Sequence, residues 1–336
     1  MKWLTAAALL MVCSACRHAV KTYGDVEGFP DHLSEWNLFT GRLRDLKPNE
    51  GVVPYDLNTP LFSDYASKRR FVWMPAGTTA VYNRDDVFEF PVGTILAKTF
   101  SFERIIETRL LVRTRTGWYG LPYVWNHQQT DARLEMVPDP VRVTYNGQTF
   151  DYAIPNANQC KSCHDRSKIV TPLGPKARNL NRDGQLQHWA QVGYLQGVPP
   201  ADQIPRAAVW SDPESGTLDE RAMAYLDVNC GHCHNPEGPA NTSGLYLTYG
   251  QRDQLRLGFH KVPVSAGNGS GGLLFDAVAG HPEESILVYR MQSVEPKVLM
   301  PELGRDVIHK EGVALIREWI LKSATVPPSK SDRPRL

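Results

Sequence analysis

The chain has 336 residues, and its 37 lysines and arginines against 36 aspartates and glutamates give a formal net charge of +1 at pH 7. This balance argues against a nucleic-acid partner or a general attraction to anionic lipid, because both need a basic excess. A hydrophobic share of 42% and a charged share of 22% exclude collagen and a wholly disordered chain. The six cysteines form three close pairs, which is unlike a disulfide framework: Cys13/Cys16, Cys160/Cys163 and Cys230/Cys233.

The N-terminus has the features of an export signal. Lys2 precedes the apolar run 4–12, which is too short to span a bilayer, and Ser14, Ala15 and Cys16 follow. We predict a lipoprotein signal peptide over residues 1–16, lipidation of Cys16 and a tether over residues 17–30. The alternative is ordinary cleavage nearby without a lipid. The mature protein is expected in the periplasm or cell envelope, with a lipid as its only membrane anchor.

Residues 31–154 are expected to form a β-rich domain, because short runs of β-branched and aromatic residues alternate with turn residues. Asn146-Gly147 predicts a two-residue hairpin turn between 141–145 and 148–152. We expect an antiparallel sandwich or barrel. The other predicted strands are 70–73, 87–90, 95–102, 105–114 and 118–125. Four tryptophans in this region are expected in the core rather than in a binding cleft: Trp36, Trp73, Trp118 and Trp125.

From Pro155 onward the pattern changes from strands to helices. Helices are predicted over 186–195, 218–228 and 312–321, with a Gly-rich loop at 267–272. The polar, proline-rich end at 325–336 is expected to be disordered. The predicted fold class is therefore α+β multidomain, with a β-rich domain followed by a mainly α region.

Two copies of C-x-x-C-H carry the strongest chemical signal: Cys160-Lys-Ser-Cys163-His164 and Cys230-Gly-His-Cys233-His234. In this motif two thiols bond to the vinyl groups of one haem and the following histidine binds its iron. The sequence therefore predicts two covalently attached haem c groups.

Two other kinds of site use paired cysteines. A four-thiolate zinc ribbon usually separates its pairs by roughly 15–20 residues, whereas 66 residues intervene here. A redox dithiol needs no histidine after the pair. Both alternatives are weaker than haem attachment.

Residues 218–321 resemble a class I cytochrome c, in which a helix leads into C-x-x-C-H and a Met-Pro loop precedes a final helix. The resemblance implies His234 as the proximal ligand and Met300, in Leu299-Met300-Pro301, as the distal ligand of the second haem. We accordingly predict a first haem segment over residues 155–215 and a cytochrome c-like domain over 216–324.

The first haem lacks an obvious second axial ligand, because no methionine lies between His164 and Gln203. The candidates are His127, His188 and Met223, or the position is vacant. His232 is expected to point outward into solvent. Gly174-Pro175 resembles the Gly-Pro of class I cytochromes, which implies that a proline carbonyl holds the ring of His164. Three arginines near the haem segments are either partners of haem propionates or merely solvated: Arg178, Arg182 and Arg290.

Several stretches resemble a bacterial family of two-haem c-type cytochrome lipoproteins of unestablished physiological role. They include 54–66, 91–94, 98–100, 107–110, 154–156 with the first motif, 173–176, 225–229 with the second motif, and 300–304. The resemblance covers nearly all of the mature chain and implies the same domain order. Members are often encoded beside a parallel β-helix protein, which implies a partner at the cell surface.

These features predict an exported two-haem cytochrome that transfers electrons to redox partners of the cell envelope. One alternative is a peroxidase-like redox enzyme with a five-coordinate first haem. Another is a haem-containing adaptor whose β-rich domain binds a partner.

Overall fold

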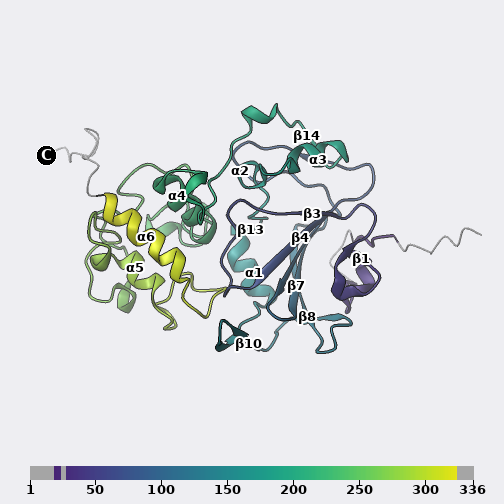
Figure 1. The fold of residues 1–336 in the computed structure, drawn as a ribbon, viewed down its shortest axis with the longest axis horizontal. Coiled ribbons are helices and arrows are strands. Elements are labelled where there is room, and N and C mark those ends of the chain that lie inside the picture. Colours follow the sequence, from purple (N-terminus) through teal and green to yellow (C-terminus); the bar gives the residue numbers. More distant parts are fainter. Residues whose placement is uncertain (1–18, 24–27, 324–336) are drawn as a thin grey trace, which may run out of the picture.

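The computed structural model describes residues 19–23 and 28–323. The predicted signal peptide, Cys16 and the tail 325–336 lie outside the described residues. The described chain is mixed α/β, with a region rich in β-sheet followed by a region with a few helices (Figure 1). None of the described helices combines the length and hydropathy needed to cross a bilayer.

The strands are β1 Phe39–Thr40, β2 Lys47–Pro48, β3 Val53–Tyr55, β4 Ser67–Trp73, β5 Ala80–Val81, β6 Ile95–Ser101, β7 Ile105–Arg113, β8 Trp118–Trp125, β9 Ala132–Leu134, β10 Val141–Tyr145, β11 Gln148–Tyr152, β12 Asp165–Arg166, β13 Ile169–Val170 and β14 Leu195–Gln196. The α-helices are α1 Ala157–His164, α2 Ala177–Leu180, α3 Gln185–Gln191, α4 Leu218–Asn229, α5 Ile286–Met291 and α6 Lys310–Ser323.

The main sheet has six antiparallel strands in the order β3-β4-β6-β7-β8-β9. Its outer strands, β3 and β9, do not pair with each other, and every other sheet among the described residues has two strands. The predicted sandwich or barrel therefore gains no support. The predicted hairpin is confirmed as β10 and β11, with positive φ at both Asn146 (47°) and Gly147 (77°).

Two local expectations were wrong. The run 87–90 forms isolated bridges instead of a strand, because Val87 bridges to Lys176 while Glu89 bridges to Val81. Beyond Pro155 extended structure does not stop: β12 and β13 form a small hairpin, and β14 pairs with β5. These pairings are only two residues long, so no hydrophobic alternation marks them in the sequence.

One face of the sheet packs against the start of the described chain. The ring centroids of Tyr23 and Trp36 lie 4.8 Å apart, and the indole N–H of Trp36 donates to the hydroxyl of Tyr123 (2.7 Å). Phe29 also packs on Trp36. The described part of the predicted tether is therefore packed on the β-rich region. Trp36, Trp118 and Trp125 are buried in hydrophobic clusters, as expected, whereas Trp73 is only partly buried at the edge of one of them.

The other face of the sheet shares a hydrophobic core with α2 and α3. Val72 and Leu96 of the sheet belong to one cluster with Leu180 and Trp189. The first predicted haem segment is therefore packed into the β-rich part and has no separate core. Residues 222–320 form a second core around α4, α5 and α6.

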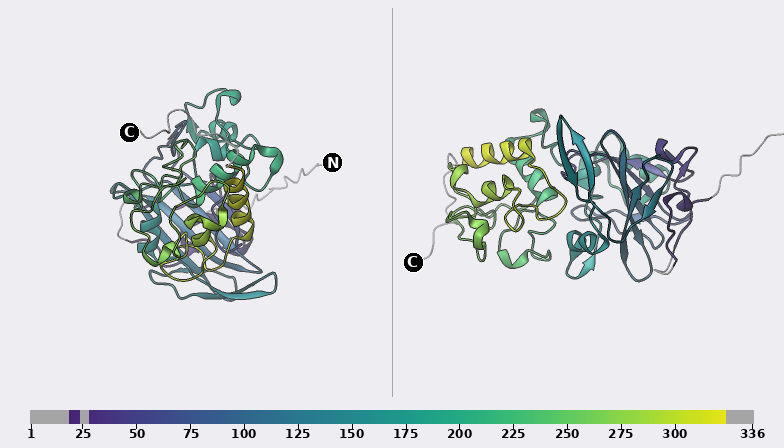
Figure 2. Two further views of the ribbon diagram at one scale, coloured as in Figure 1. Left: turned by 90° about the vertical axis from the view of Figure 1, so that its left-hand side faces the viewer. Right: turned by 90° about the horizontal axis from the view of Figure 1, so that it is seen from below.

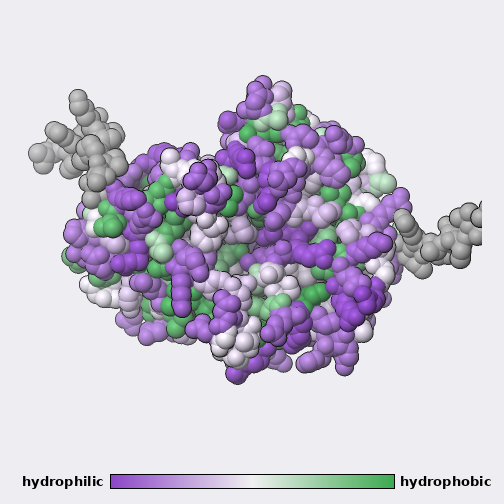
Figure 3. Space-filling model, in the orientation of Figure 1, coloured by the Kyte–Doolittle hydropathy of each residue, from purple (hydrophilic) through white to green (hydrophobic). Residues whose placement is uncertain are grey.

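The two parts lie side by side along the long axis of the molecule (Figure 2). Polar residues cover most of the face in Figure 3, and hydrophobic residues are visible between the two parts. The predicted helices 218–228 and 312–321 are confirmed as α4 and α6, whereas the helix predicted over 186–195 ends earlier, as α3, and Leu195 belongs to β14. A capping box between Thr217 and Glu220 fixes the start of α4.

Candidate functional site

A cavity of about 1050 Å³ lies between the two parts of the molecule. Both C-x-x-C-H motifs reach it, although 65 residues separate them in the sequence. Five of the seven predicted haem-binding residues line it: Cys160, Cys163, His164, Cys230 and Met300. The other two, Cys233 and His234, adjoin the lining without being part of it. The volume is at the upper end of the roughly 300–1,000 Å³ typical of ligand pockets.

The first motif lies on α1 itself. Pro155 precedes the helix, and a capping box between Asn156 and Gln159 fixes its start. The helix begins only three residues before Cys160, so no long helix leads into this motif. The helix packs against β8, where a Cβ added to Gly120 would lie only 2.9 Å from the Cβ of Cys160. Glycine at this position therefore allows α1 to approach the sheet.

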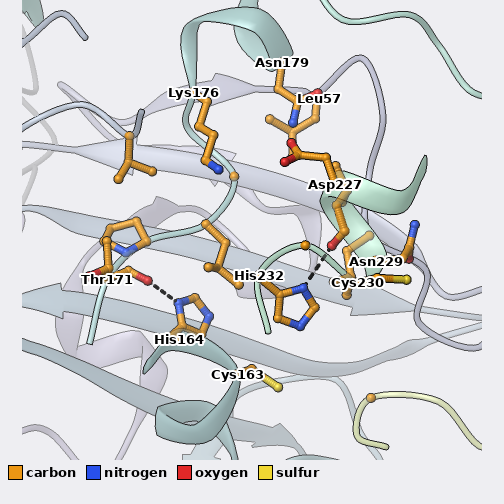
Figure 4. A pocket seen from close by; sticks show the side chains of 18 of the residues that line it. Leu57, Cys163, His164, Thr171, Lys176, Asn179, Asp227, Asn229, Cys230 and His232 are labelled. Atoms are coloured by element: carbon orange, nitrogen blue, oxygen red, sulfur yellow. Dashed lines mark hydrogen bonds between the residues drawn. The ribbon is translucent and has the colours of Figure 1, made fainter. Parts of the chain in front are cut away.

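Three histidines of the two motifs share one hydrogen-bond pattern. The Nδ1–H of His164 donates to the carbonyl of Thr171 (2.8 Å), and that of His232 donates to the carbonyl of Val228 (3.2 Å) (Figure 4). The Nδ1 of His234 lies 3.3 Å from the hydroxyl oxygen of Ser243. Their Nε2 atoms form no hydrogen bond with the described residues. Such a partner on Nδ1 fixes the tautomer that leaves Nε2 free to bind a metal.

Burial keeps the histidines and thiols of the motifs neutral. It lowers the pKa of His164, His232 and His234 to about 4. For His232 the charge of the nearby His164 lowers the pKa further. Burial raises the pKa of the Cys160 and Cys163 thiols, and that of Cys230 and Cys233 to about 12. A neutral imidazole is the form that binds iron.

Met300 is held by backbone contacts and by a buried arginine. Its N–H donates to the carbonyl of Arg290 (3.0 Å), and its carbonyl accepts from Nε of Arg305 (3.0 Å). Arg305 also donates to the carbonyls of Arg290 (3.1 Å) and Ser293 (2.9 Å). A positive charge on Arg290 lowers the pKa of His234, which places the loop near that histidine.

The cavity-facing side of the sheet carries three cations in one row. Arg70 of β4, Lys98 of β6 and Arg109 of β7 are directly paired across the strands. All three line the cavity, and Lys98 and Arg109 both lower the pKa of His164. Directly opposed like charges destabilise a sheet unless an anion compensates them.

Only part of this positive charge has a partner. Arg70 pairs with Asp56 (2.9 Å), and Arg109 pairs with the buried Glu107. Among the described residues Lys98 has no carboxylate partner, and burial together with the neighbouring cations holds its pKa well below its usual range.

Four buried polar atoms at the cavity lack hydrogen-bond partners among the described residues: Oγ of Ser63, Nη2 of Arg70, Nε of Arg178 and Oδ1 of Asn179. Arg178 lines the cavity and donates to the carboxylate of Asp227 (2.7 Å). The other two arginines singled out in the sequence, Arg182 and Arg290, do not line it. The cavity therefore combines a largely apolar lining with two unpaired arginine donors, Nη2 of Arg70 and Nε of Arg178, which fit a largely apolar group with carboxylates at its edge.

None of the three proposed distal ligands of the first haem lines the cavity. His127 and His188 are exposed, and Met223 is buried in the core around α4. The resemblance implied that the carbonyl of Pro175 holds the ring of His164. That carbonyl instead accepts from the N–H of Phe88 (3.3 Å), and the carbonyl of Thr171 holds the ring. Likewise His232 is not directed into solvent, since it lines the cavity beside His164.

The four described cysteines are unpaired thiols. Within residues 19–23 and 28–323, three potential metal-binding side chains meet only at the exposed group His281, Glu283 and Glu284. The four thiols are not gathered around one point, so a four-thiolate zinc site gains no support.

The arrangement gathers the two motifs, the thioethers of Met291 and Met300, the imidazole of His309 and a cluster of cations at or beside one cavity. Sequence reasoning missed His232 and the row Arg70, Lys98 and Arg109. The alternating Lys68 and Arg70 hinted that one strand face is basic, but the pairing register of the row is set by the sheet. No protein-family model, curated protein or solved structure matches the chain.

Proposed function

We propose that the protein is an exported c-type cytochrome that transfers electrons through two covalently attached haems. The observation that carries the proposal is the convergence of two C-x-x-C-H motifs on one cavity between the two parts of the molecule. The residues present fit haem: thiols at the required spacing, neutral imidazoles with free Nε2 atoms, an apolar lining and buried cations.

The C-terminal part is proposed to be a class I cytochrome c-like domain. Three features support this: α4 ends directly before Cys230, the Met300 loop lies between α5 and α6, and α4 packs against α6 in one core. His234 and Met300 would then be the axial ligands of the second haem.

Each haem would supply an iron that changes by one electron between its ferric and ferrous states. Cys160 and Cys163 would hold the first haem, and Cys230 and Cys233 the second. Thr171 and Ser243 fix the rings of His164 and His234, while Arg305 fixes the backbone of Met300. The row of Arg70, Lys98 and Arg109 would hold the propionates of the first haem.

The two haems would lie close enough for electron exchange. A thiolate at Cys163 raises the pKa of Cys233, which supports a short distance between the two motifs. Two nearby haems whose irons have both axial positions filled are suited to an electron relay. We further propose that the signal peptide 1–16 directs export, that Cys16 carries the lipid and that redox proteins of the cell envelope are the partners, a parallel β-helix protein among them.

The test uses full-length protein, matured in a host that exports it and attaches haem c. Intact mass spectrometry should show the mature chain with the mass of two haem groups, and redox titration should resolve two one-electron steps. The double variant C160A/C163A and the double variant C230A/C233A should each lose one haem. Recovery of unmodified thiols, or of bound zinc instead of haem, would contradict the proposal.

Binding of small ligands to the intact protein distinguishes the peroxidase-like alternative from the electron relay. A relay with saturated iron should show no spectral change with peroxide, cyanide or carbon monoxide. Turnover of peroxide with a high-spin first haem would instead establish the enzyme.

A further inference from the structure

His232 belongs to the second motif but lies beside the histidine of the first. It lines the cavity, and a charge on His164 lowers its pKa. Figure 4 shows the two rings next to each other, His164 from α1 and His232 from the turn after α4. The two imidazoles therefore enter the same space from opposite parts of the molecule.

Each ring presents the same atom to that space. The carbonyls of Thr171 and Val228 occupy the two Nδ1 atoms, which leaves both Nε2 atoms without a hydrogen bond to the described residues. Next to His232, a Cβ on Gly231 would lie 2.8 Å from the carbonyl oxygens of Asp227 and Leu247. The backbone is therefore packed closely at this point, which fixes the position of the main chain that carries the side chain of His232.

The segments that carry the two rings are tied together by direct contacts. The N–H of Ser167 donates to the carbonyl of Glu237 (2.8 Å), and Arg166 is hydrogen-bonded to the Glu237 carboxylate. Behind them, the buried pair of Arg178 and Asp227 joins α2 to α4 (2.7 Å). These contacts hold the segment after His164 against the segment after His234.

The other metal-binding side chains of the cavity are committed elsewhere or lie on the sheet. The Nδ1 of His309 is hydrogen-bonded to the hydroxyl of Tyr225 (3.0 Å), and its ring stacks on Phe62. Met291 and Met300 belong to the C-terminal core and its loop. Lys98 is the strongest alternative metal-binding side chain, since it lies near His164. However, Lys98 and His164 come from the same side of the cavity, because Lys98 belongs to the sheet that also supports α1.

We propose that His232 is the second axial ligand of the first haem, opposite His164. This inference rests on the proposed function and deepens it. The first haem would be closed to substrates by two histidines. His232 also lies between Cys230 and Cys233, so one five-residue segment would contact both haems and join them by a short covalent path.

The test is the spin state of the ferric holoprotein, compared between the wild type, H232A and the control H188A. His188 is exposed on α3 and away from the cavity. In H232A half of the low-spin EPR signal should be replaced by a high-spin signal, and about one carbon monoxide should bind per reduced chain. Added imidazole should restore the low-spin signal, whereas H188A should match the wild type.

The wild type provides an independent measurement. Its near-infrared magnetic circular dichroism should contain one band for histidine–histidine ligation and one for histidine–methionine ligation. The inference would be overturned if H232A retained two low-spin haems. The clearest contradiction would be a high-spin haem in K98M but not in H232A. A high-spin haem in the wild type would overturn it as well. Failure of haem attachment in the wild type, seen by mass, would instead refute the proposed function itself.

Discussion

At the scale of single residues, the environment of Met300 is built mainly from main-chain carbonyls. Arg305 is buried and donates to the carbonyls of Arg290, Ser293 and Met300, without a carboxylate partner among the described residues. A charged group that satisfies several carbonyls rigidifies a loop that lacks regular secondary structure. The position of the thioether is therefore set by a residue five positions further along the chain.

On the proposed function, replacing Met300 with alanine should remove the thioether ligand of the second haem. The thioether–iron charge-transfer band should disappear, and the potential of that haem should fall by on the order of 100 mV, because a thioether favours ferrous iron. Absorption spectroscopy and redox titration measure both effects.

The matched control is M136A, because Met136 is 54% exposed. It should leave the band and both potentials unchanged. A band that persists in M300A would exclude Met300 as the ligand.

At the scale of elements, β4, β6 and β7 place Arg70, Lys98 and Arg109 in one row below the first motif. Phe100 on β6 supports the row, with Arg109 4.2 Å and Lys98 4.7 Å from its ring centroid. The row gives the sheet a function beyond packing, because its charge is directed at the cavity.

The variant K98M should lower the potential of the first haem. A haem propionate beside Lys98 would offset the effect of burial on its pKa and keep the amine protonated. A nearby positive charge favours the ferrous state, so its removal should shift the potential downward by on the order of tens of millivolts. Redox titration that resolves the two haems measures the shift.

The exposed Lys322 on α6 provides the control, since K322M removes the same charge from the far end of the molecule. An unchanged potential of the first haem in K98M would show that the row does not face it.

At the scale of the whole molecule, the segment before β4 joins the two parts. Oδ1 of Asp64 accepts from the N–H groups of Asp306 (2.8 Å) and Val307 (2.9 Å), and the hydroxyl of Tyr65 donates to Glu311 (2.7 Å). The same segment stacks Phe62 on His309. These contacts close the cavity at the side of α6.

Asp64 should make stability depend on pH. Burial raises its pKa from 3.8 to about 6, against the opposing effect of the two N–H donors. Its protonated form is therefore favoured by folding, and the contribution is complete below about pH 4 and lost as the pH rises through about 6.

Over that interval the free energy of unfolding should lose up to about 3 kcal/mol from this group alone. D64N, which keeps an acceptor but cannot titrate, should lack this part of the pH dependence. Denaturant unfolding at several pH values measures it, and D202N, at an exposed site on the 3₁₀-helix Ala201–Gln203, is the control. Identical pH profiles for D64N and wild type would refute the role.

Local patterns predicted much of this molecule. The hairpin at Asn146-Gly147, the long strands and the helices α4 and α6 follow from turn chemistry and hydrophobic periodicity, which act over a few residues. The two motifs were recognisable because their spacing is rigid. The cavity between them was not, because it depends on how residues 155–204 pack on the sheet.

The difference between local patterns and long-range packing also explains which residues of the site could be predicted. His232 looked like a solvent-exposed residue, because nothing in Cys-Gly-His-Cys-His shows that α1 lies opposite. The contacts between Arg166 and Glu237 and between Arg178 and Asp227 span 71 and 49 residues, so no local pattern contains them. Pairing register and the docking of the two parts decided which side chains share the cavity.

The central claim is that two haems occupy one cavity in close contact. The most direct measurement is the EPR spectrum of the fully oxidised holoprotein, compared with the spectra of C160A/C163A and C230A/C233A, which are each expected to retain one haem. The wild-type spectrum should differ from the sum of the two single-haem spectra, because neighbouring ferric centres interact magnetically. A wild-type spectrum equal to that sum would place the haems far apart and contradict the account.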